Sequence, residues 1–233
     1  MNDPMGSAIS EYFHTGKASK LVVQSSLFDD DVIPVPHLFR TYKQMPPLEK
    51  KAMDIAQGKT LDVGAGAGCH SLHLQEKGID VKAIDISKLS CEVMRERGIK
   101  SVECIDFFDV TIKECYDTIL MLMNGTGIVG KISNLPHFFQ TVKKRLTPNG
   151  QLLIDSTDLC YLYEDEEGFI ELPEEGYYGE IDFRMKYKNV QGEPFDWLYL
   201  DFETLAASAA SEGLHCEKVM DGKHYDYLAK ITF

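Results

Sequence analysis

From Lys59 to the end of the chain, short apolar runs alternate with amphipathic stretches of helical period. The runs are rich in Val, Ile and Leu, and they read KTLDVG, DVKAIDI, SVECIDF, YDTILMLMN, GQLLIDST, LHCEKVM and DYLAKITF. Near-continuous apolar runs are typical of parallel strands that are buried on both faces, with helices as the connections between them. This alternation predicts an α/β fold built on a doubly wound, mostly parallel sheet.

The connection between the last two runs is short. Only the segment DGK, at residues 221–223, separates them. Such a connection suits a hairpin but cannot contain a crossover helix. We therefore expect the last strand to be antiparallel to its neighbour.

A different pattern interrupts the alternation within residues 157–200. Apolar residues at positions 181, 183, 185 and 187 alternate with polar residues, and a second run, FDWLYL, follows NVQGEP. This period of two predicts a β-hairpin inserted after the fifth strand, preceded by an acidic loop. The aromatic residues of this insertion are expected to form the hairpin core, although a subset beside the acidic loop is also suited to binding an organic cation. They are Tyr161, Tyr163, Phe169, Tyr177, Tyr178, Phe183, Tyr187, Phe195, Trp197 and Tyr199.

The first 58 residues have a different character. Prolines at positions 34, 36, 46 and 47 interrupt two expected helices, one near residues 10–24 and one near residues 47–56. We predict that residues 1–58 form an N-terminal helical cap, or lid, within the same domain as residues 59–233.

Three glycines follow the first of the apolar runs. In the stretch LDVGAGAGCHSLHL, Gly64, Gly66 and Gly68 alternate with alanines just before a helical pattern. Glycines at such a turn let backbone N–H groups and a helix N-terminus approach a ligand. The dinucleotide fingerprint G-x-G-x-x-G/A requires Gly or Ala at position 69, where this chain has Cys69, so this fingerprint fails.

The stretch fits D-x-G-x-G-x-G, with Asp62 two residues before the first glycine. This motif resembles motif I of the class I, Rossmann-like methyltransferases that use S-adenosylmethionine. The resemblance extends from Thr60 to Phe233, because the order of strands and helices matches that family's seven-stranded sheet with its antiparallel last strand. It implies a methyltransferase that uses S-adenosyl-L-methionine and releases S-adenosyl-L-homocysteine.

The resemblance also implies a set of cofactor-binding residues. The methionyl part would contact Asp62, the backbone from Gly64 through Ala65 to Gly66, and the carbonyls near Met123 and Asn124. Asp85, at the end of the second strand, would bind the ribose hydroxyls, and Ile86 would pack on the adenine. Asp106 would accept from adenine N6, while the backbone N–H of Phe107 would meet N1. Gly68 completes the loop, and Arg40 is a further candidate for the methionyl carboxylate.

Three of these residues have an alternative interpretation. Asp85, helped by Ser87, is also placed to cap the following helix. Asp106 is also suited to capping a turn, and Arg40 to a salt bridge on the surface.

The residues of the chemical step are not evident from the sequence. Methyl transfer from a sulfonium chiefly requires alignment of the nucleophile and exclusion of water, so a catalytic base is not obligatory. His70, Asp155 and His14 are candidate bases, with His14 and Tyr12 placed to close over the site. His70 resembles a structural position of the family, and Asp155 with Asp158 is also suited to capping a loop.

The fourth strand ends in MNGTGIVG, at residues 123–130. It lacks the Asn-Pro-Pro-aromatic motif of the family members that methylate exocyclic amines of bases or glutamine amides. Small molecules are therefore the expected acceptors, with peptides or proteins as the alternative.

The formal net charge of −13 makes nucleic acid a poor partner, and Lys143, Lys144 and Arg145 look like a solvated helix end. No membrane span or secretion signal is evident, and the six cysteines and seven histidines lack metal-ligand spacing. We expect a cytoplasmic protein without a bound metal, and the sequence does not predict its oligomeric state.

Two rival functions use the same cofactor corner of the fold. A non-catalytic S-adenosylmethionine-binding sensor or partner module needs every residue named above except a base. A nucleotide-dependent oxidoreductase is disfavoured by Cys69.

Overall fold

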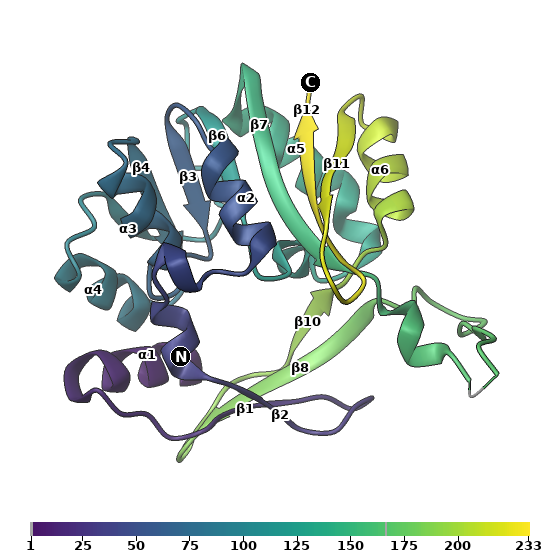
Figure 1. Ribbon diagram of the computed structural model, residues 1–233, viewed down its shortest axis with the longest axis horizontal. Helices are drawn as coiled ribbons and strands as arrows, with labels where there is room; N and C mark the ends of the chain where they lie inside the picture. The colour runs from purple at the N-terminus through teal and green to yellow at the C-terminus, as the bar shows by residue number, and fades with distance from the viewer. Residues whose placement is uncertain (1, 166) are drawn as a thin grey trace.

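The computed structural model describes residues 2–165 and 167–233. A seven-stranded sheet forms its centre, in the order β11-β12-β7-β6-β3-β4-β5 (Figure 1). Its strands are β3 (Thr60–Val63), β4 (Val81–Asp85), β5 (Val102–Cys104), β6 (Tyr116–Met121), β7 (Leu146–Thr157), β11 (His215–Asp221) and β12 (Asp226–Thr232). The strands from β5 to β7 are parallel, whereas β12 is antiparallel to both β7 and β11. The predicted α/β sheet and its terminal hairpin are confirmed.

Helices cover both faces of this sheet. On one face lie α2 (Pro47–Ile55), α3 (Cys69–Glu76) and α4 (Lys88–Glu96), and on the other lie α5 (Leu135–Arg145) and α6 (Phe202–Ser211). Strand β6 is buried on both faces, which explains its apolar sequence. Ile119 and Met121 pack on the face covered by α5, and Leu120 packs on the face covered by α2.

The N-terminal segment differs from the prediction of two helices. Helix α1 spans Pro4–Thr15, and Leu21–Gln24 is strand β1 instead of the end of a helix. Asp3 caps the start of α1 by accepting from the backbone N–H of Gly6 at 2.7 Å, and Gly16 ends the helix in the left-handed conformation. The prediction of a helix near residues 47–56 is confirmed by α2.

The residues of the N-terminal segment and the insertion form one second sheet, in the order β10-β8-β1-β2, with β9 paired to β8. The strands are β1, β2 (Asp31–Ile33), β8 (Glu180–Tyr187), β9 (Val190–Gln191) and β10 (Phe195–Leu198). The predicted hairpin is therefore present, but the expectation of a purely helical cap is wrong because β1 pairs with β8.

The second sheet lies beyond the end of the main sheet toward which β3 points in Figure 1. The carboxyl ends of the parallel strands face it, and this is where α/β sheets bind their ligands. Short 3₁₀ helices connect the elements: η1 (Val35–Phe39), η2 (Tyr42–Gln44), η3 (Gly125–Val129), η4 (Ile132–Asn134) and η5 (Leu159–Tyr163).

Candidate active site

The three glycines of the loop between β3 and α3 have two different surroundings. Gly64, Gly66 and Gly68 have φ angles of 66°, 56° and 79°, a left-handed region that favours glycine. A Cβ added to Gly64 would meet nothing within 4 Å, and one on Gly66 would have only two neighbours, both at 4.0 Å. A Cβ on Gly68 would lie 2.3 Å from Ile99 Cδ1. Gly64 and Gly66 therefore border open space, whereas Gly68 permits close packing beneath the loop.

Asp85 lies at the end of β4, beside this loop. Its Oδ2 accepts from the backbone N–H of Gly66 at 2.8 Å, and its Oδ1 accepts from that of Ser87 at 2.8 Å. Burial raises the pKa of Asp85, against the effect of these two bonds. The cap of α4 is Ser87 itself, which accepts from the backbone N–H of Ser90. Each oxygen of Asp85 keeps acceptor capacity for a ligand hydroxyl.

Ile86, Asp106 and Phe107 lie on the next loops along the same edge. Ile86 is 69% exposed, so its side chain is accessible to a ligand. Asp106 is exposed, and its Oδ1 accepts from the backbone N–H of Phe108, so the turn-capping interpretation is confirmed for one oxygen. The Phe107 ring is buried, while its backbone N–H makes no hydrogen bond with a described residue.

The turn after β6 has a strained backbone held by Asp155. Met123 and Asn124 both have positive φ angles, 70° and 58°, which are uncommon outside glycine. Asp155 accepts from the N–H groups of Met123 at 3.2 Å and Gly125 at 3.0 Å. Asp155 therefore stabilises the turn after β6, and not the loop after β7 that the sequence also suggested. In that loop, Asp158 caps η5. Burial raises the pKa of Asp155 to about 6.

Asp62 is buried beneath the glycine loop. Its Oδ2 accepts from the Ser71 hydroxyl at 2.5 Å, which joins β3 to α3. Burial raises the pKa of Asp62, while His70 and Ser71 act in the opposite direction. A cationic ligand group beside this carboxylate would favour its charged form.

Arg40, Glu49 and His70 form a buried cluster at the same edge. Glu49 Oε2 accepts from Arg40 Nε at 2.7 Å and from Arg40 Nη2 at 2.6 Å, and it lies 3.0 Å from His70 Nε2. Burial lowers the pKa of His70, but Cys69, Glu49 and Asp62 outweigh this effect and raise it to about 10. The salt bridge expected on the surface for Arg40 is therefore in the interior, where Arg40 is only 4% exposed. The same His70 Nε2 also lies 3.2 Å from Arg40 Nη2, so Glu49 and Arg40 both contact this nitrogen, and the raised pKa disfavours the neutral form that a base needs.

His14 lies outside this group of residues. Its ring contacts Ser10 and Glu96 near the end of α4, and both side chains of the His14–Glu96 pair are about half exposed. Tyr12 packs on Phe39 with ring centroids 4.9 Å apart. The structure therefore places α1 over α4 and the glycine loop, but does not direct His14 toward Asp85 or Asp155.

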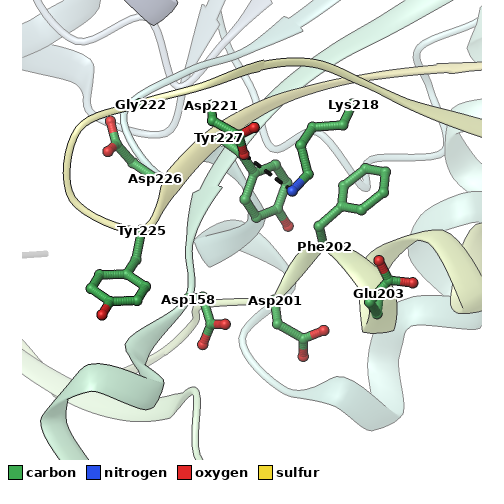
Figure 2. Close-up of a pocket in the computed structure, with 10 residues that line it drawn as sticks. All are labelled: Asp158, Asp201, Phe202, Glu203, Lys218, Asp221, Gly222, Tyr225, Asp226 and Tyr227. Carbon is green, nitrogen blue, oxygen red and sulfur yellow. Dashed lines mark ion pairs between the residues drawn. The ribbon is translucent and has the colours of Figure 1, made fainter. Parts of the chain in front are cut away.

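A pocket of about 350 Å³ lies at the same sheet edge, beyond β7 (Figure 2). It is formed by the loop after β7, the start of α6 and the β11–β12 turn, and Lys218 pairs with Asp221 at 3.1 Å within it. β7 is separated from β3 by β6, so this pocket is distinct from the glycine loop. Its lining residues are Asp158, Asp201, Phe202, Glu203, Lys218, Asp221, Gly222, Tyr225, Asp226 and Tyr227.

The sequence predicted no supporting role at the site for Glu49 or Arg145. Glu49 had no local signal, because only its tertiary partners explain a buried carboxylate. Arg145, expected at a solvated helix end, is 4% exposed, donates to the carbonyl of Asp109 at 2.8 Å and lies 4.8 Å from the Phe107 ring. Trp197 lies against Gly127, where a Cβ would be 1.8 Å from the indole.

The comparisons with known proteins agree with this geometry. Residues 61–154 match the family described as Methyltransferase domain. The crystal structure of an S-adenosylmethionine-dependent methyltransferase from Bacteroides fragilis, in complex with S-adenosyl-L-homocysteine, is similar with a TM-score of 0.94 and 56% sequence identity. The similarity covers 99% of this chain and 94% of that chain.

Two further relatives are more distant. An uncharacterized methyltransferase of Staphylococcus carnosus (strain TM300) is 28% identical over 177 residues, 76% of this chain and 79% of that protein. The cypemycin N-terminal methyltransferase of a Streptomyces species is 30% identical over 105 residues, 43% of each protein.

The fold and the site define a class I methyltransferase. The chain belongs to the S-adenosylmethionine-dependent methyltransferases, and it is an enzyme that uses S-adenosyl-L-methionine as methyl donor. The oxidoreductase and non-catalytic alternatives are therefore wrong.

Proposed function

We propose that this enzyme methylates a small molecule held between the second sheet and the carboxyl edge of the main sheet. The observation that carries the proposal is the open space at Gly64 and Gly66, next to the Asp85 carboxylate. This edge also carries the Met123–Asn124 turn, and the second sheet lies over it. An enclosed space next to the sulfonium suits methyl transfer, which needs alignment and exclusion of water.

The proposed cofactor contacts follow the edge from β6 to β5. The methionyl part contacts Asp62, the backbone of residues 64–66 and the carbonyls of residues 123 and 124. Asp85 binds the ribose hydroxyls, and Ile86 packs on the adenine. Asp106 accepts from adenine N6, and the backbone N–H of Phe107 donates to N1. The exposed Ile86 and the Phe107 N–H, which no described residue accepts from, support the adenine end.

Arg40 is also a candidate for binding the methionyl carboxylate, but most of its N–H groups already have partners. Its Nε and Nη2 already bind Glu49, and its Nη1 donates to the carbonyl of His37 at 2.7 Å. Nη2 also lies 3.2 Å from His70 Nε2, so a contact with the cofactor would use the second N–H bond of Nη1.

Catalysis proceeds by alignment, without a proton-abstracting base among the three candidates. His70 is tied to Glu49, and Asp155 is tied to two backbone N–H groups. His14 is paired with Glu96. An acceptor delivered as a neutral amine or a thiolate needs no further base.

The test is a titration calorimetry experiment followed by a turnover assay. We expect heat on titration with S-adenosyl-L-homocysteine, weakened by Asp85→Ala, and release of S-adenosyl-L-homocysteine from S-adenosyl-L-methionine with a small acceptor. Turnover of peptides only would contradict the small-molecule proposal.

A peptide acceptor is the second candidate. The named relative that supports it is the cypemycin N-terminal methyltransferase, whose matched region covers 43% of this chain. For either acceptor the strongly negative chain disfavours nucleic acid as a partner, and the cytoplasm is the proposed location. In the described residues, no helix is both long enough and apolar enough to cross a bilayer.

A further inference from the structure

The face of the second sheet that meets the main domain is identified by its strand register. Leu21 is opposite Tyr187 and Val23 is opposite Met185, while Phe183 pairs with Phe195. Residues directly opposite each other in an antiparallel pair share a face. One face therefore carries Leu21, Val23, Ile181, Phe183, Met185, Tyr187, Phe195 and Trp197.

The two ends of this face are supported by different parts of the protein. At one end, Leu21 and Tyr187 are buried with Ala8 of α1. At the other end, Trp197 lies against Gly127 of η3, and the Thr126 hydroxyl donates to the carbonyl of Leu198 at 2.8 Å. Both supports belong to the cofactor edge, because α1 packs on the glycine loop and η3 follows the Met123–Asn124 turn.

Phe183 and Met185 lie between these supports along β8. Both are only half-buried, whereas Ile181 and Tyr187 at either end are 1% and 2% exposed. The middle of this face is therefore less covered than its two ends. Under the proposed function, the acceptor lies beside this less covered part of β8.

Aromatic rings surround this uncovered position. Phe183 lies 6.2 Å from Phe195 and 6.4 Å from Tyr199, and Phe195 lies 6.0 Å from Trp197, measured between ring centroids. The interplanar angles are 57°, 80° and 77°, so none of these pairs is stacked face to face. In an edge-to-face pair, the ring that presents its edge keeps its own faces uncovered by that partner, so they can contact another aromatic group.

Two polar atoms of this cluster lack a partner. Neither the Trp197 Nε1–H nor the Tyr199 hydroxyl has a hydrogen bond with any residue that the structure describes. Neither atom is among the fully buried atoms without a partner, and both side chains are partly exposed, so the two groups are open to a ligand. Burial raises the pKa of Tyr199 to about 12, so this hydroxyl is protonated at neutral pH and is available as a donor.

We infer that Phe183, Phe195, Trp197 and Tyr199, here called the aromatic wall, bind an acceptor that contains a planar aromatic ring. The ring lies against Phe183, and a polar substituent bonds to the Trp197 N–H or the Tyr199 hydroxyl. This inference rests on the proposed function, since it names the acceptor class for the same site. Trp197, held against Gly127, determines specificity and takes no part in bond making.

The chain offers a direct probe, because Trp197 is its only tryptophan. The enzyme saturated with S-adenosyl-L-homocysteine is titrated with three matched pairs of probes, and Trp197 fluorescence is followed. The pairs are benzylamine with cyclohexylmethylamine, phenol with cyclohexanol, and benzyl alcohol with cyclohexylmethanol. Within each pair the ring is aromatic in one member and saturated in the other.

We expect an aromatic member to bind about two- to tenfold more tightly than its saturated partner, since an aromatic contact adds about 0.5 to 1.5 kcal/mol beyond burial of area. Phe183→Leu should abolish the preference and leave affinity for S-adenosyl-L-homocysteine unchanged. Lys186→Ala, an exposed position on the opposite face of β8, is the matched control and should change neither.

Equal binding of both members in all three pairs, or binding of none, would overturn the inference. Retention of the preference in Phe183→Leu would overturn it as well. A failure of S-adenosyl-L-homocysteine to bind at the start would instead contradict the proposed cofactor site, so the two failures are distinguishable.

Discussion

The Asp85 carboxylate accepts a hydrogen bond of 2.8 Å from the backbone N–H of Gly66. This bond joins the end of β4 to the glycine loop of β3, so the group proposed for the ribose also fixes the loop proposed for the methionyl part. Asp85→Asn removes the charge and keeps the size. We expect S-adenosyl-L-homocysteine to bind 10- to 100-fold more weakly, since hydrogen bonds to charged groups contribute about 1.5 to 3 kcal/mol.

Titration calorimetry measures this loss. Asp80→Asn is the control, because Asp80 is exposed just before the same strand begins. Equal affinity of the two variants would contradict the role of Asp85.

The glycines of the loop should respond differently to alanine. Gly64→Ala should lower stability by about 1 to 2 kcal/mol, because alanine disfavours the left-handed backbone at this position. Its methyl group would also extend into the open space proposed for the cofactor, so cofactor binding should weaken at least tenfold. Gly68→Ala also places its methyl 2.3 Å from Ile99 Cδ1, and overpacking adds about 1 to 3 kcal/mol. Urea unfolding with parallel calorimetry separates the two effects. Wild-type affinity in Gly64→Ala would show that the open space is not the cofactor site.

Asp155 should make stability depend on pH between 4 and 6. Its pKa is raised from 3.8 to about 6 in the folded protein, so the folded state binds the proton more tightly than the unfolded state. This contribution to stability is complete below pH 3.8 and is lost as the pH rises through about 6. The free energy of unfolding of the wild type, relative to Asp155→Asn, should fall by up to about 3 kcal/mol over this range.

Urea denaturation of both proteins at pH 4, 5, 6 and 7 tests this expectation. A difference that stays constant, or that rises with pH, would show that burial does not raise the pKa of Asp155.

Arg145 should affect cofactor binding more than stability. It holds the loop of Phe107 through the Asp109 carbonyl and the aromatic ring, while its Nη1 is buried without a partner in the described part of the chain. Arg145→Met keeps an apolar stem and removes the unpaired donor, so stability should change by less than about 1 kcal/mol. Affinity for S-adenosyl-L-homocysteine should fall severalfold, because the adenine loop is less ordered.

Lys144→Met, at the exposed neighbouring position, is the control for Arg145→Met. Lower stability together with unchanged affinity would assign Arg145 a structural role only.

The main sheet was predictable because its signals are local. Each buried strand such as β6 is one apolar run, and the terminal hairpin follows from a connection too short for a helix. In the second sheet the hairpin was predicted but the addition of β1 and β2 was not, because β1 has four residues and pairs with β8, more than 150 residues later in the chain. A four-residue stretch before a proline-rich segment does not reveal such a distant partner.

The same distinction applies to the site. Gly64 and Asp85 follow strands, and the carboxyl ends of parallel strands meet at one edge, so their positions could be anticipated. Arg40 is buried against Glu49, and Arg145 is buried against the Phe107 ring. Both burials depend on tertiary contacts between distant segments. Charged residues look like surface residues until such partners are known.

The central claim is tested most directly by a crystal structure of this chain with S-adenosyl-L-homocysteine. We predict that the ribose hydroxyls lie within hydrogen-bonding distance of Asp85, the adenine between Ile86 and the Phe107 loop, and the sulfur directed toward the aromatic wall. A ligand bound elsewhere, for example in the pocket of Figure 2, would contradict the account.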